Sequence, residues 1–416
     1  MACNDFMRAQ SRWRTGVKSL TMRALIVSPF YPPDLGGISY HVGNLASRLA
    51  DRGWDITVVA CSRKRPMYRA SGTLKVELVK AIYLPEWPLQ TLSSLSLPVG
   101  FSKRFRQLIR DSSPDLVHFH GHHYPITWLA AAIGYSQKVP TLLTLHGTYA
   151  LNTRRPYGKS IPEEIFNRTI FTSLLQMSDA IIGPGKNVID YAKNFLVGQR
   201  ASYVIPNGID IKRYMTGLER RREFREKYGF PSEAKVVLFT GRFAYPKGVL
   251  ELAESAKSFR DQGMRALFVL AGGGPLEQKL REMSRHLNNL IVLDWIPSDQ
   301  IPELYLASDI FVLPSRWEAQ AISVIEAMAS HLHVVATPVG GVPSLLQGYP
   351  RKNFARGFSS TDIAQAVKEA IGRLDEGPRP DPLVIEYMHR FDWDTVVRET
   401  ETAYLQVIRS RAKKST

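Results

Sequence analysis

The sequence of 416 residues predicts an α/β protein with two doubly wound, Rossmann-like domains. Short apolar runs alternate along the chain with longer amphipathic segments, which is typical of the strand–helix alternation in α/β folds. The runs are almost continuously apolar, as expected for strands buried on both faces of a parallel sheet. A turn-rich segment at 206–214, PNGIDIKRY, interrupts the alternation before it restarts. We therefore expect two domains joined near residue 208.

The first helix is the clearest element of the first half. Ile38, Val42, Leu45 and Leu49 share one face of it, and Gly53 ends it. The strands expected in this half are 23–28, 55–60, 75–79, 115–119, 141–145, 179–183 and 201–205.

The second half repeats the rhythm and ends in a closing helix, expected at 389–411. Its expected strands are 235–240, 266–271, 290–294, 309–313 and 333–337. The predicted division of the whole chain is a basic, disordered extension at 1–21, a first domain at 22–207, a second domain at 208–388 and the closing helix at 389–416.

Composition excludes several classes of protein. Apolar residues make up 44% and charged residues 22%, as in ordinary globular proteins. The longest apolar run, 126–134, has about half of the ~18 residues that a membrane-spanning helix needs. The first 21 residues lack the apolar core of a secretory signal. Two cysteines, Cys3 and Cys61, build neither a disulfide framework nor a cysteine zinc site, so a cytoplasmic location is expected.

The net charge of +16 is unusual, and most of the excess lies in the first half. Residues 22–200 hold 21 basic and 11 acidic side chains. A basic surface favours nucleic acid, anionic lipid or phosphorylated ligands. No recognised nucleic-acid module occurs, so a basic nucleic-acid-binding protein is the weaker alternative.

Ligands in doubly wound sheets bind at the carboxyl ends of the strands, so candidate residues are sought in the loops there. Gly36 and Gly37 precede the first helix, where free N–H groups favour an anion, although such a pair is also an ordinary tight turn. His146 follows a strand and is either structural or functional. Arg242 and Lys247 lie between the first strand and first helix of the second domain, where they suit a diphosphate or form a solvated loop.

Four further histidines, in the run HFHGHHYP, raise the possibility of a metal site. No carboxylate motif nearby completes such a site, so we expect none. The four are His118, His120, His122 and His123.

The most specific pattern is PSRWEAQAISVIEAMAS, in which Glu318 follows a strand and Glu326 lies in a helix. Eight helical residues advance about 12 Å, roughly the span from a transferred sugar to a nucleoside ribose. One carboxylate then reaches the sugar and the other the ribose, with the N–H groups from Ala319 to Ile322 directed at the phosphates. The alternative is an amphipathic helix that carries two glutamates by chance.

The chain resembles the retaining glycosyltransferases of the GT-B fold, in glycosyltransferase family four (the group 1 glycosyltransferases). The resemblance implies two Rossmann-like domains that face each other across a cleft, the first on the acceptor side and the second binding the nucleotide sugar. It rests on ordered motifs at 36–37, 115–121, 145–147, 206–210, 241–248, 271–275, 308–315 and 318–326.

The resemblance also implies a role for each candidate residue. Arg242 and Lys247 match the residues that hold the donor diphosphate, and Glu318 and His146 match those at the transferred sugar. Glu326 matches the carboxylate on the ribose. Ala321 and Ile322, together with Gly36 and Gly37, match positions near the donor.

The chain departs from the family pattern in three places. Ala319-Gln320-Ala321 replaces the frequent Gly-Phe-Gly, Ser344 replaces a usual glutamate, and GYPRKNFARGF at 348–358 replaces a segment that usually reads like NGLLV. These changes bear on the sugar contacts and on the donor loop beyond residue 343.

The resulting prediction is a retaining hexosyltransferase that uses a nucleoside-diphosphate sugar, needs no metal or other cofactor, and acts on a glycan or lipid-linked acceptor in envelope polysaccharide or glycolipid synthesis. The alternatives are a sugar-nucleotide epimerase or a phosphorylase of the same fold. A basic amphipathic segment at 101–110, FSKRFRQLIR, predicts weak peripheral association with the anionic inner face of the membrane, or else a domain helix with a solvated basic face.

Overall fold

The computed structural model describes residues 21–34, 36–62, 67–83, 96–148, 161–294, 296–374 and 381–415. Almost all of the predicted basic extension, 1–20, lies outside these residues. Contacts divide the chain into one unit of 1–143, 177–179 and 404–416 and a second unit of 144–176 and 180–403. The domain boundaries predicted after residues 207 and 388 stay predictions.

The first unit contains a mostly parallel sheet in the order β3-β4-β2-β1-β6-β7. Its central strands are buried along nearly their whole length, as continuous apolar runs require. The strands are β1 (Arg23–Ser28), β2 (Asp55–Ser62), β3 (Met67–Ser71), β4 (Leu74–Tyr83), β5 (Ser96–Pro98), β6 (Leu116–His120) and β7 (Thr141–Thr144). The helices are α2 (Gly37–Asp51), α3 (Phe101–Ser112) and α4 (Pro125–Ser136).

Two strands of this unit are absent from the predicted set, and both are antiparallel to β4. β3 pairs with β4 from Met67 to Ser71, and β5 pairs with the end of β4. β3 is short, and its described side chains, from Tyr68 on, are exposed, so it lacks the apolar run that marks a buried strand.

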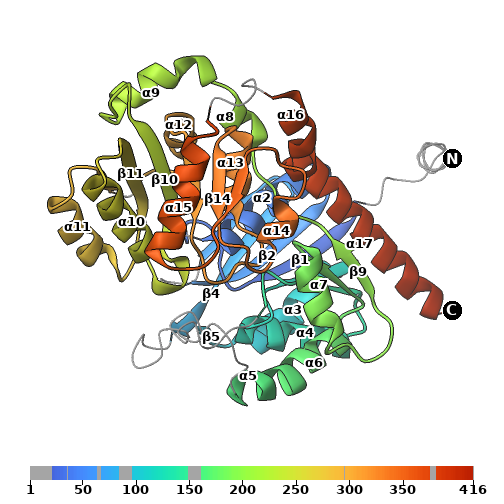
Figure 1. The fold of residues 1–416 in the computed structure, drawn as a ribbon. Coiled ribbons are helices and arrows are strands. Elements are labelled where there is room, and N and C mark those ends of the chain that lie inside the picture. Colours follow the sequence, from blue (N-terminus) through green and yellow to red (C-terminus); the bar gives the residue numbers. More distant parts are fainter. Residues whose placement is uncertain are drawn as a thin grey trace. The chain divides into compact units, whose positions relative to one another are not determined.

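The second unit contains a parallel sheet in the order β12-β11-β10-β13-β14-β15. Figure 1 labels β10, β11 and β14 of this sheet. β8 and β9, which continue the strand order of the first sheet after β7, are parallel neighbours in this unit. The strands are β8 (Ala180–Gly183), β9 (Ala201–Val204), β10 (Lys235–Arg242), β11 (Ala266–Gly273), β12 (Leu290–Leu293), β13 (Ile310–Leu313), β14 (His333–Ala336) and β15 (Lys352–Phe354).

Helices connect these strands, with a π-helical turn at Asn167–Phe171 and short 3₁₀ turns at Leu218–Arg220, Tyr245–Lys247 and His389–Phe391. The helices are α5 (Ile161–Phe166), α6 (Thr172–Gln176), α7 (Lys186–Lys193), α8 (Ile211–Met215), α9 (Arg221–Lys227), α10 (Val249–Asp261), α11 (Glu277–Arg285), α12 (Ile301–Leu306), α13 (Ile322–Ala329), α14 (Val342–Leu345), α15 (Ser360–Ile371) and α16 (Pro382–Met388). The last helix, α17 (Trp393–Ser415), extends through parts of both units.

Alternate residues of the second sheet pack into two separate apolar cores. Val236 and Leu238 of β10 belong to one core, and Val237 and Phe239 belong to the other. Helices therefore cover both faces of the sheet, which confirms the predicted doubly wound architecture.

Aspartates that stand directly before strands join neighbouring strands at their amino ends. The carboxylate of Asp115 accepts the backbone N–H of Arg23 at 2.8 Å, and that of Asp309 accepts the N–H of Val236 at 2.8 Å. Asp179 does the same for Thr141 at 2.9 Å. These contacts satisfy a backbone donor in the first or second residue of each neighbouring strand.

The closing helix begins later than predicted. A 3₁₀ turn ends at Phe391, Asp392 is extended, and α17 starts at Trp393. The side chain of Asp392 accepts the backbone N–H of Asp394 at 2.9 Å, which is the usual way that an aspartate starts a helix.

Candidate active site

The loop after β10 carries both predicted cations. Arg242 is the last residue of the strand and its side chain is exposed, while Lys247 lies just before α10. Gly248 has φ 65°, and a methyl group there would lie 2.1 Å from the carbonyl oxygen of Pro314. Only glycine fits this position, so the β10 loop packs directly on the loop that leaves β13.

That close packing brings Lys247 and Glu318 together. Lys247 Nζ lies 2.6 Å from Glu318 Oε1, and the buried hydroxyl of Ser315 donates to the same oxygen at 2.8 Å. The side chain of Lys247 is 34% exposed and that of Glu318 is 8% exposed. The glutamate side chain of the pair is therefore nearly buried and the lysine side chain is partly open to solvent, which suits a cation that can also contact a ligand.

The loop after β14 holds the backbone of Glu318 in place. Gly340 has φ 53°, and a methyl group there would lie 1.8 Å from the Glu318 carbonyl oxygen. The N–H of Gly341 donates to that oxygen at 3.1 Å. Sequence analysis missed this support, although a Gly-Gly pair after a buried strand is the signal that could have indicated it.

Glu326 lies four residues inside α13 and is partly buried. The hydroxyl of Tyr214 donates to its Oε1 at 2.7 Å, and that of Tyr305 donates to its Oε2 at 2.9 Å. Burial raises the pKa of Glu326, while the two hydroxyl groups and then the positive charge of Arg213 act to lower it. Sequence analysis did not identify either tyrosine.

The spacing argument for the two glutamates was wrong in one respect. α13 begins at Ile322, and Ala321 is the residue before its first turn. Glu318 therefore lies in the preceding loop, and only about half of the eight-residue interval rises as a helix. The estimate of about 12 Å does not apply, because the loop sets the position of Glu318.

His146 lies in the loop after β7 and is partly buried. The neighbouring Leu145 donates its N–H to Ile182 at 2.8 Å, which anchors the start of this loop. Within the second unit, a methyl group at Gly147 would lie 2.9 Å from the ring of Trp317. The residue after His146 thus approaches the residue before Glu318.

Gly36 and Gly37 stand where the sequence predicts them, at the start of α2. Gly36 is exposed with φ 131°, and the space beside it is open. The helix has no side-chain cap and no acidic residue in its first turn. Its positive amino end is therefore not offset locally, and an anion is favoured there.

The histidines of the first unit are packed side chains. His118 Nδ1 and the hydroxyl of Tyr404 are 2.7 Å apart, and the His118 and His120 rings lie 4.0 Å apart. Burial lowers the pKa of His118, with a contribution from His41, and burial lowers the pKa of His123 to about 3. Among the residues that the structure describes, no group of three or more His, Cys, Asp or Glu side chains is arranged to hold a metal ion.

The amphipathic segment at 101–110 forms α3, and its apolar face lies in the core. Phe101 is 1% exposed and Phe105 is 0% exposed. Arg104 makes a bidentate pair with Glu77 at 2.7 and 2.8 Å. The apolar face is thus covered by protein, as the alternative of a domain helix with a solvated basic face expects, and membrane association stays a prediction. No helix in the described ranges is long and apolar enough to cross a membrane.

Two protein families match the chain. The family described as Glycosyltransferase Family 4 matches residues 35–213, and the family described as Glycosyl transferases group 1 matches residues 220–373.

Curated relatives carry the same kind of description. A glycosyltransferase of Bacillus subtilis named for teichuronic acid biosynthesis, TuaC, is 32% identical over 266 residues. That match covers 64% of this chain and 62% of the relative. A D-inositol 3-phosphate glycosyltransferase of Corynebacterium aurimucosum is 25% identical over 409 residues, covering 92% of this chain and 95% of the relative.

Solved structures of similar fold include a sucrose-phosphate synthase from Thermosynechococcus elongatus, with a TM-score of 0.75 and 18% identity over 94% of this chain and 100% of that chain. Anabaena HepE in complex with UDP has a TM-score of 0.70 and 18% identity over 92% of this chain and 100% of that chain.

Proposed function

Because the chain belongs to the group 1 glycosyltransferases of family four and has the GT-B fold, we propose that it transfers a hexose from a nucleoside-diphosphate sugar to a glycan or lipid-linked acceptor. We propose further that the anomeric configuration of the sugar is retained. The observation that carries this proposal is the contact between Lys247 and Glu318, supported by Ser315.

This contact joins the two charges that the reaction needs. The leaving group is a nucleoside diphosphate whose negative charge grows as the bond to the sugar breaks, and fixed positive charge stabilises it. Lys247 can exchange the Glu318 oxygen for a diphosphate oxygen, and exposed Arg242 can bind beside it. Glu318 is then left to face the developing positive charge of the sugar.

The two cations and the helix amino ends provide this stabilisation without a metal, so we propose that none is required. The acceptor hydroxyl attacks on the face that the diphosphate leaves, which retains the configuration without a covalent sugar–enzyme intermediate. His146 is assigned to the sugar, Glu326 to the ribose, and the backbone of Ala321 and Ile322 to the phosphates.

We propose an acceptor in envelope polysaccharide or glycolipid synthesis, at the cytoplasmic face of the membrane. Of the relatives described above, TuaC is named for teichuronic acid biosynthesis, which supports a polysaccharide acceptor, whereas the other is named for D-inositol 3-phosphate. The side chains of Lys103, Arg106 and Arg110 are exposed on α3 and give it a basic outer face. We propose weak electrostatic association through this face. Co-sedimentation with anionic vesicles at low salt should exceed that with neutral vesicles, and equal, negligible binding to both would remove the membrane proposal.

The test of the function is a screen of the purified protein with UDP-, GDP- and ADP-sugars, followed by acceptors for the sugar that is consumed. Proton NMR of the product should give the same anomeric configuration as the donor. An inverted product would contradict retention, and a protein that binds and consumes none of these sugars would contradict the function.

The same preparation tests the three alternatives, none of which any observation favours. Absorption by pyridoxal phosphate would indicate a phosphorylase, conversion of the nucleotide sugar without an acceptor would indicate an epimerase, and salt-sensitive retention of nucleic acid on filters would indicate a nucleic-acid-binding protein.

A further inference from the structure

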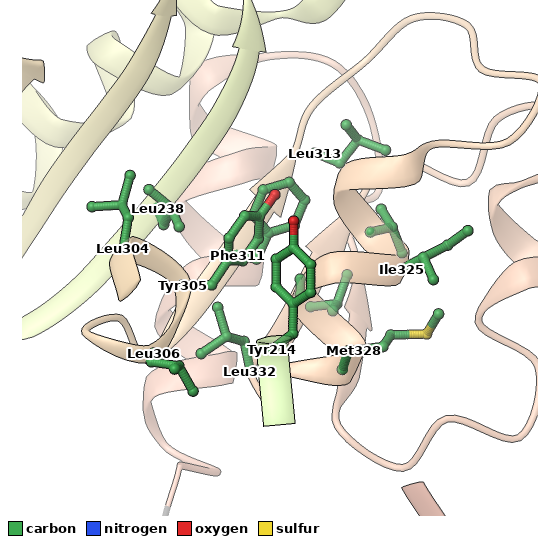
Figure 2. Close-up of a cluster of buried hydrophobic side chains, with 14 of the residues drawn as sticks. Tyr214, Leu238, Leu304, Tyr305, Leu306, Phe311, Leu313, Ile325, Met328 and Leu332 are labelled. Carbon is green, nitrogen blue, oxygen red and sulfur yellow. The ribbon is translucent and has the colours of Figure 1, made fainter. Parts of the chain in front are cut away.

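Two tyrosines from different helices bind the carboxylate of Glu326, one on each oxygen. Tyr214 comes from α8 and Tyr305 from α12, and their rings meet edge to face with centroids 5.7 Å apart. Figure 2 shows both hydroxyl groups directed to the same side of the apolar cluster that surrounds them.

The hydroxyl groups, rather than the rings, need an explanation. Both side chains lie in an apolar core with neighbours such as Phe311 and Met328, where phenylalanine would supply almost the same packing. A buried hydroxyl is costly unless it finds a partner, and here each one finds the same carboxylate.

A third hydroxyl connects this arrangement to β10, the strand that ends at Arg242. Thr240 Oγ1 lies 2.5 Å from the Tyr305 hydroxyl oxygen. Tyr305 gives its single proton to Glu326, with the carbonyl oxygen of Ser323 also 3.2 Å away, so Thr240 is the donor to Tyr305. Thr240 stands two residues before Arg242 on β10. A buried chain of hydrogen bonds thus runs from the strand of the proposed diphosphate residue to Glu326.

We propose that Tyr214 and Tyr305 are positioning residues that hold Glu326 ionised and oriented as the acceptor of ribose hydroxyl groups. The inference rests on the proposed function, which gives Glu326 that role. Each carboxylate oxygen has two lone pairs, and each tyrosine uses one of them. One lone pair on each oxygen is left, which matches two neighbouring hydroxyl groups on a ribose.

The pKa of Glu326 depends directly on these two hydrogen bonds. Burial raises it, and hydrogen bonds from the two tyrosines oppose that rise. Loss of either hydroxyl should therefore raise the pKa further, and the carboxylate should be protonated at a higher pH. The titratable groups on the elements packed against α13 are Lys212, Arg213 and Tyr214 of α8, Glu303 and Tyr305 of α12, Glu386 and Tyr387 of α16, and His333 of β14.

The variants Tyr214→Phe and Tyr305→Phe test the proposal, with Tyr349→Phe as a matched control. Tyr349 is fully buried in the same core and donates its hydroxyl to Leu332 O at 2.6 Å. The control thus loses an equally buried hydroxyl that does not touch Glu326. If hydroxyl loss acted only through packing, all three variants would behave alike.

The first measurement needs no ligand. The protein is labelled with ¹³C at glutamate carboxyl groups, and the Glu326 signal is identified by its loss in Glu326→Gln. We expect the midpoint of its pH titration to move upward in Tyr214→Phe and Tyr305→Phe and to stay in place in Tyr349→Phe. An unchanged midpoint in both tyrosine variants would overturn the proposal.

The second measurement is calorimetric binding of whichever of UDP, GDP and ADP binds the parent protein most tightly, beside its 2′,3′-dideoxy counterpart. We expect each tyrosine variant to bind the ribose form about 3- to 10-fold more weakly and the dideoxy form as the parent does. Equal losses for both forms would indicate general damage to the site and contradict the proposal. If the parent binds none of the three diphosphates, the proposed function is wrong and the ribose role falls with it, while the titration still decides whether the tyrosines hold the carboxylate.

Discussion

The two glutamates of the PSRWEAQAISVIEAMAS segment lie in opposite chemical environments. Glu318 is in a loop, and a cation that is itself partly open to solvent pairs with it. Glu326 is in a helix, and two neutral hydroxyl groups from an apolar core bind it. The charge of Glu318 is compensated by Lys247, which can bind a diphosphate instead. The charge of Glu326 is stabilised by hydrogen bonds from two neutral hydroxyl groups. The first environment should respond to salt and the second to pH.

The largest expected effect follows the loss of charge at Glu318. Glu318→Gln should lower turnover by about 1000-fold, because the developing positive charge of the sugar loses its stabilising carboxylate. The matched control is Glu303→Gln, which removes a carboxylate paired with exposed Lys227 elsewhere in the unit. Steady-state kinetics with both variants check this prediction. Near-parent turnover in Glu318→Gln would contradict the assignment of Glu318 to the transferred sugar.

The next effect concerns His146, the proposed second residue at the sugar. His146→Ala should lower turnover by about 100-fold with little change in donor affinity, because its contact strengthens in the transition state. Circular dichroism should establish that the variant is folded before kinetics are compared. A folded variant with normal turnover would assign His146 a packing role.

Removal of the cations should affect binding more than chemistry. Lys247→Ala and Arg242→Ala should each weaken free nucleoside diphosphate by about 10-fold at low salt, and by less at high salt, because screening reduces what the parent gains from them. Lys227→Ala, which removes an exposed cation paired with Glu303, is the control. Losses that do not change with salt would show that the cations act other than by charge.

The smallest effect is the pH dependence of ribose recognition. The pKa of Glu326 is raised by burial, so the carboxylate becomes protonated at a higher pH than an exposed glutamate. As pH falls through that pKa, the preference for a ribose over a dideoxyribose diphosphate should shrink by about 3- to 10-fold. Because both ligands carry the same diphosphate, the effect of phosphate titration cancels in the ratio of the two affinities. Glu326→Gln should have a ratio that is independent of pH, and a pH-dependent ratio in that variant would contradict the assignment.

Most of the fold could be predicted because buried parallel strands appear in the sequence as nearly continuous apolar runs. The apolar runs at 23–28 and 333–337 became β1 and β14 within a residue of their predicted ends. β3, which pairs antiparallel with β4, and β15, which has only three residues, were missed because neither has a long apolar run. The start of the last helix was misplaced because Asp392 begins the helix through its side chain, which hydrophobic periodicity does not register.

The site was predictable where its residues lie in loops at the carboxyl ends of predicted strands. Lys247 and Glu318 were both named from their loops, and the structure brings them together. Tyr214 and Tyr305 were missed because neither lies in a loop at the carboxyl end of a strand: Tyr214 ends a turn-rich segment, and Tyr305 stands in an apolar stretch that is typical of a core. The segment 101–110 left two interpretations open, because amphipathicity alone does not distinguish burial in protein from burial in lipid, and the structure places its apolar face in the core.

The division of labour between the two glutamates is tested most directly by calorimetric titration of free nucleoside diphosphate into Glu318→Gln and Glu326→Gln, beside the parent protein. This ligand has a ribose and a diphosphate but no transferred sugar. Glu318→Gln should bind it as tightly as the parent or more tightly, because Lys247 is released from its partner, and Glu326→Gln should bind it about 10-fold more weakly. The reverse order, or parent-like binding by both variants, would contradict the account.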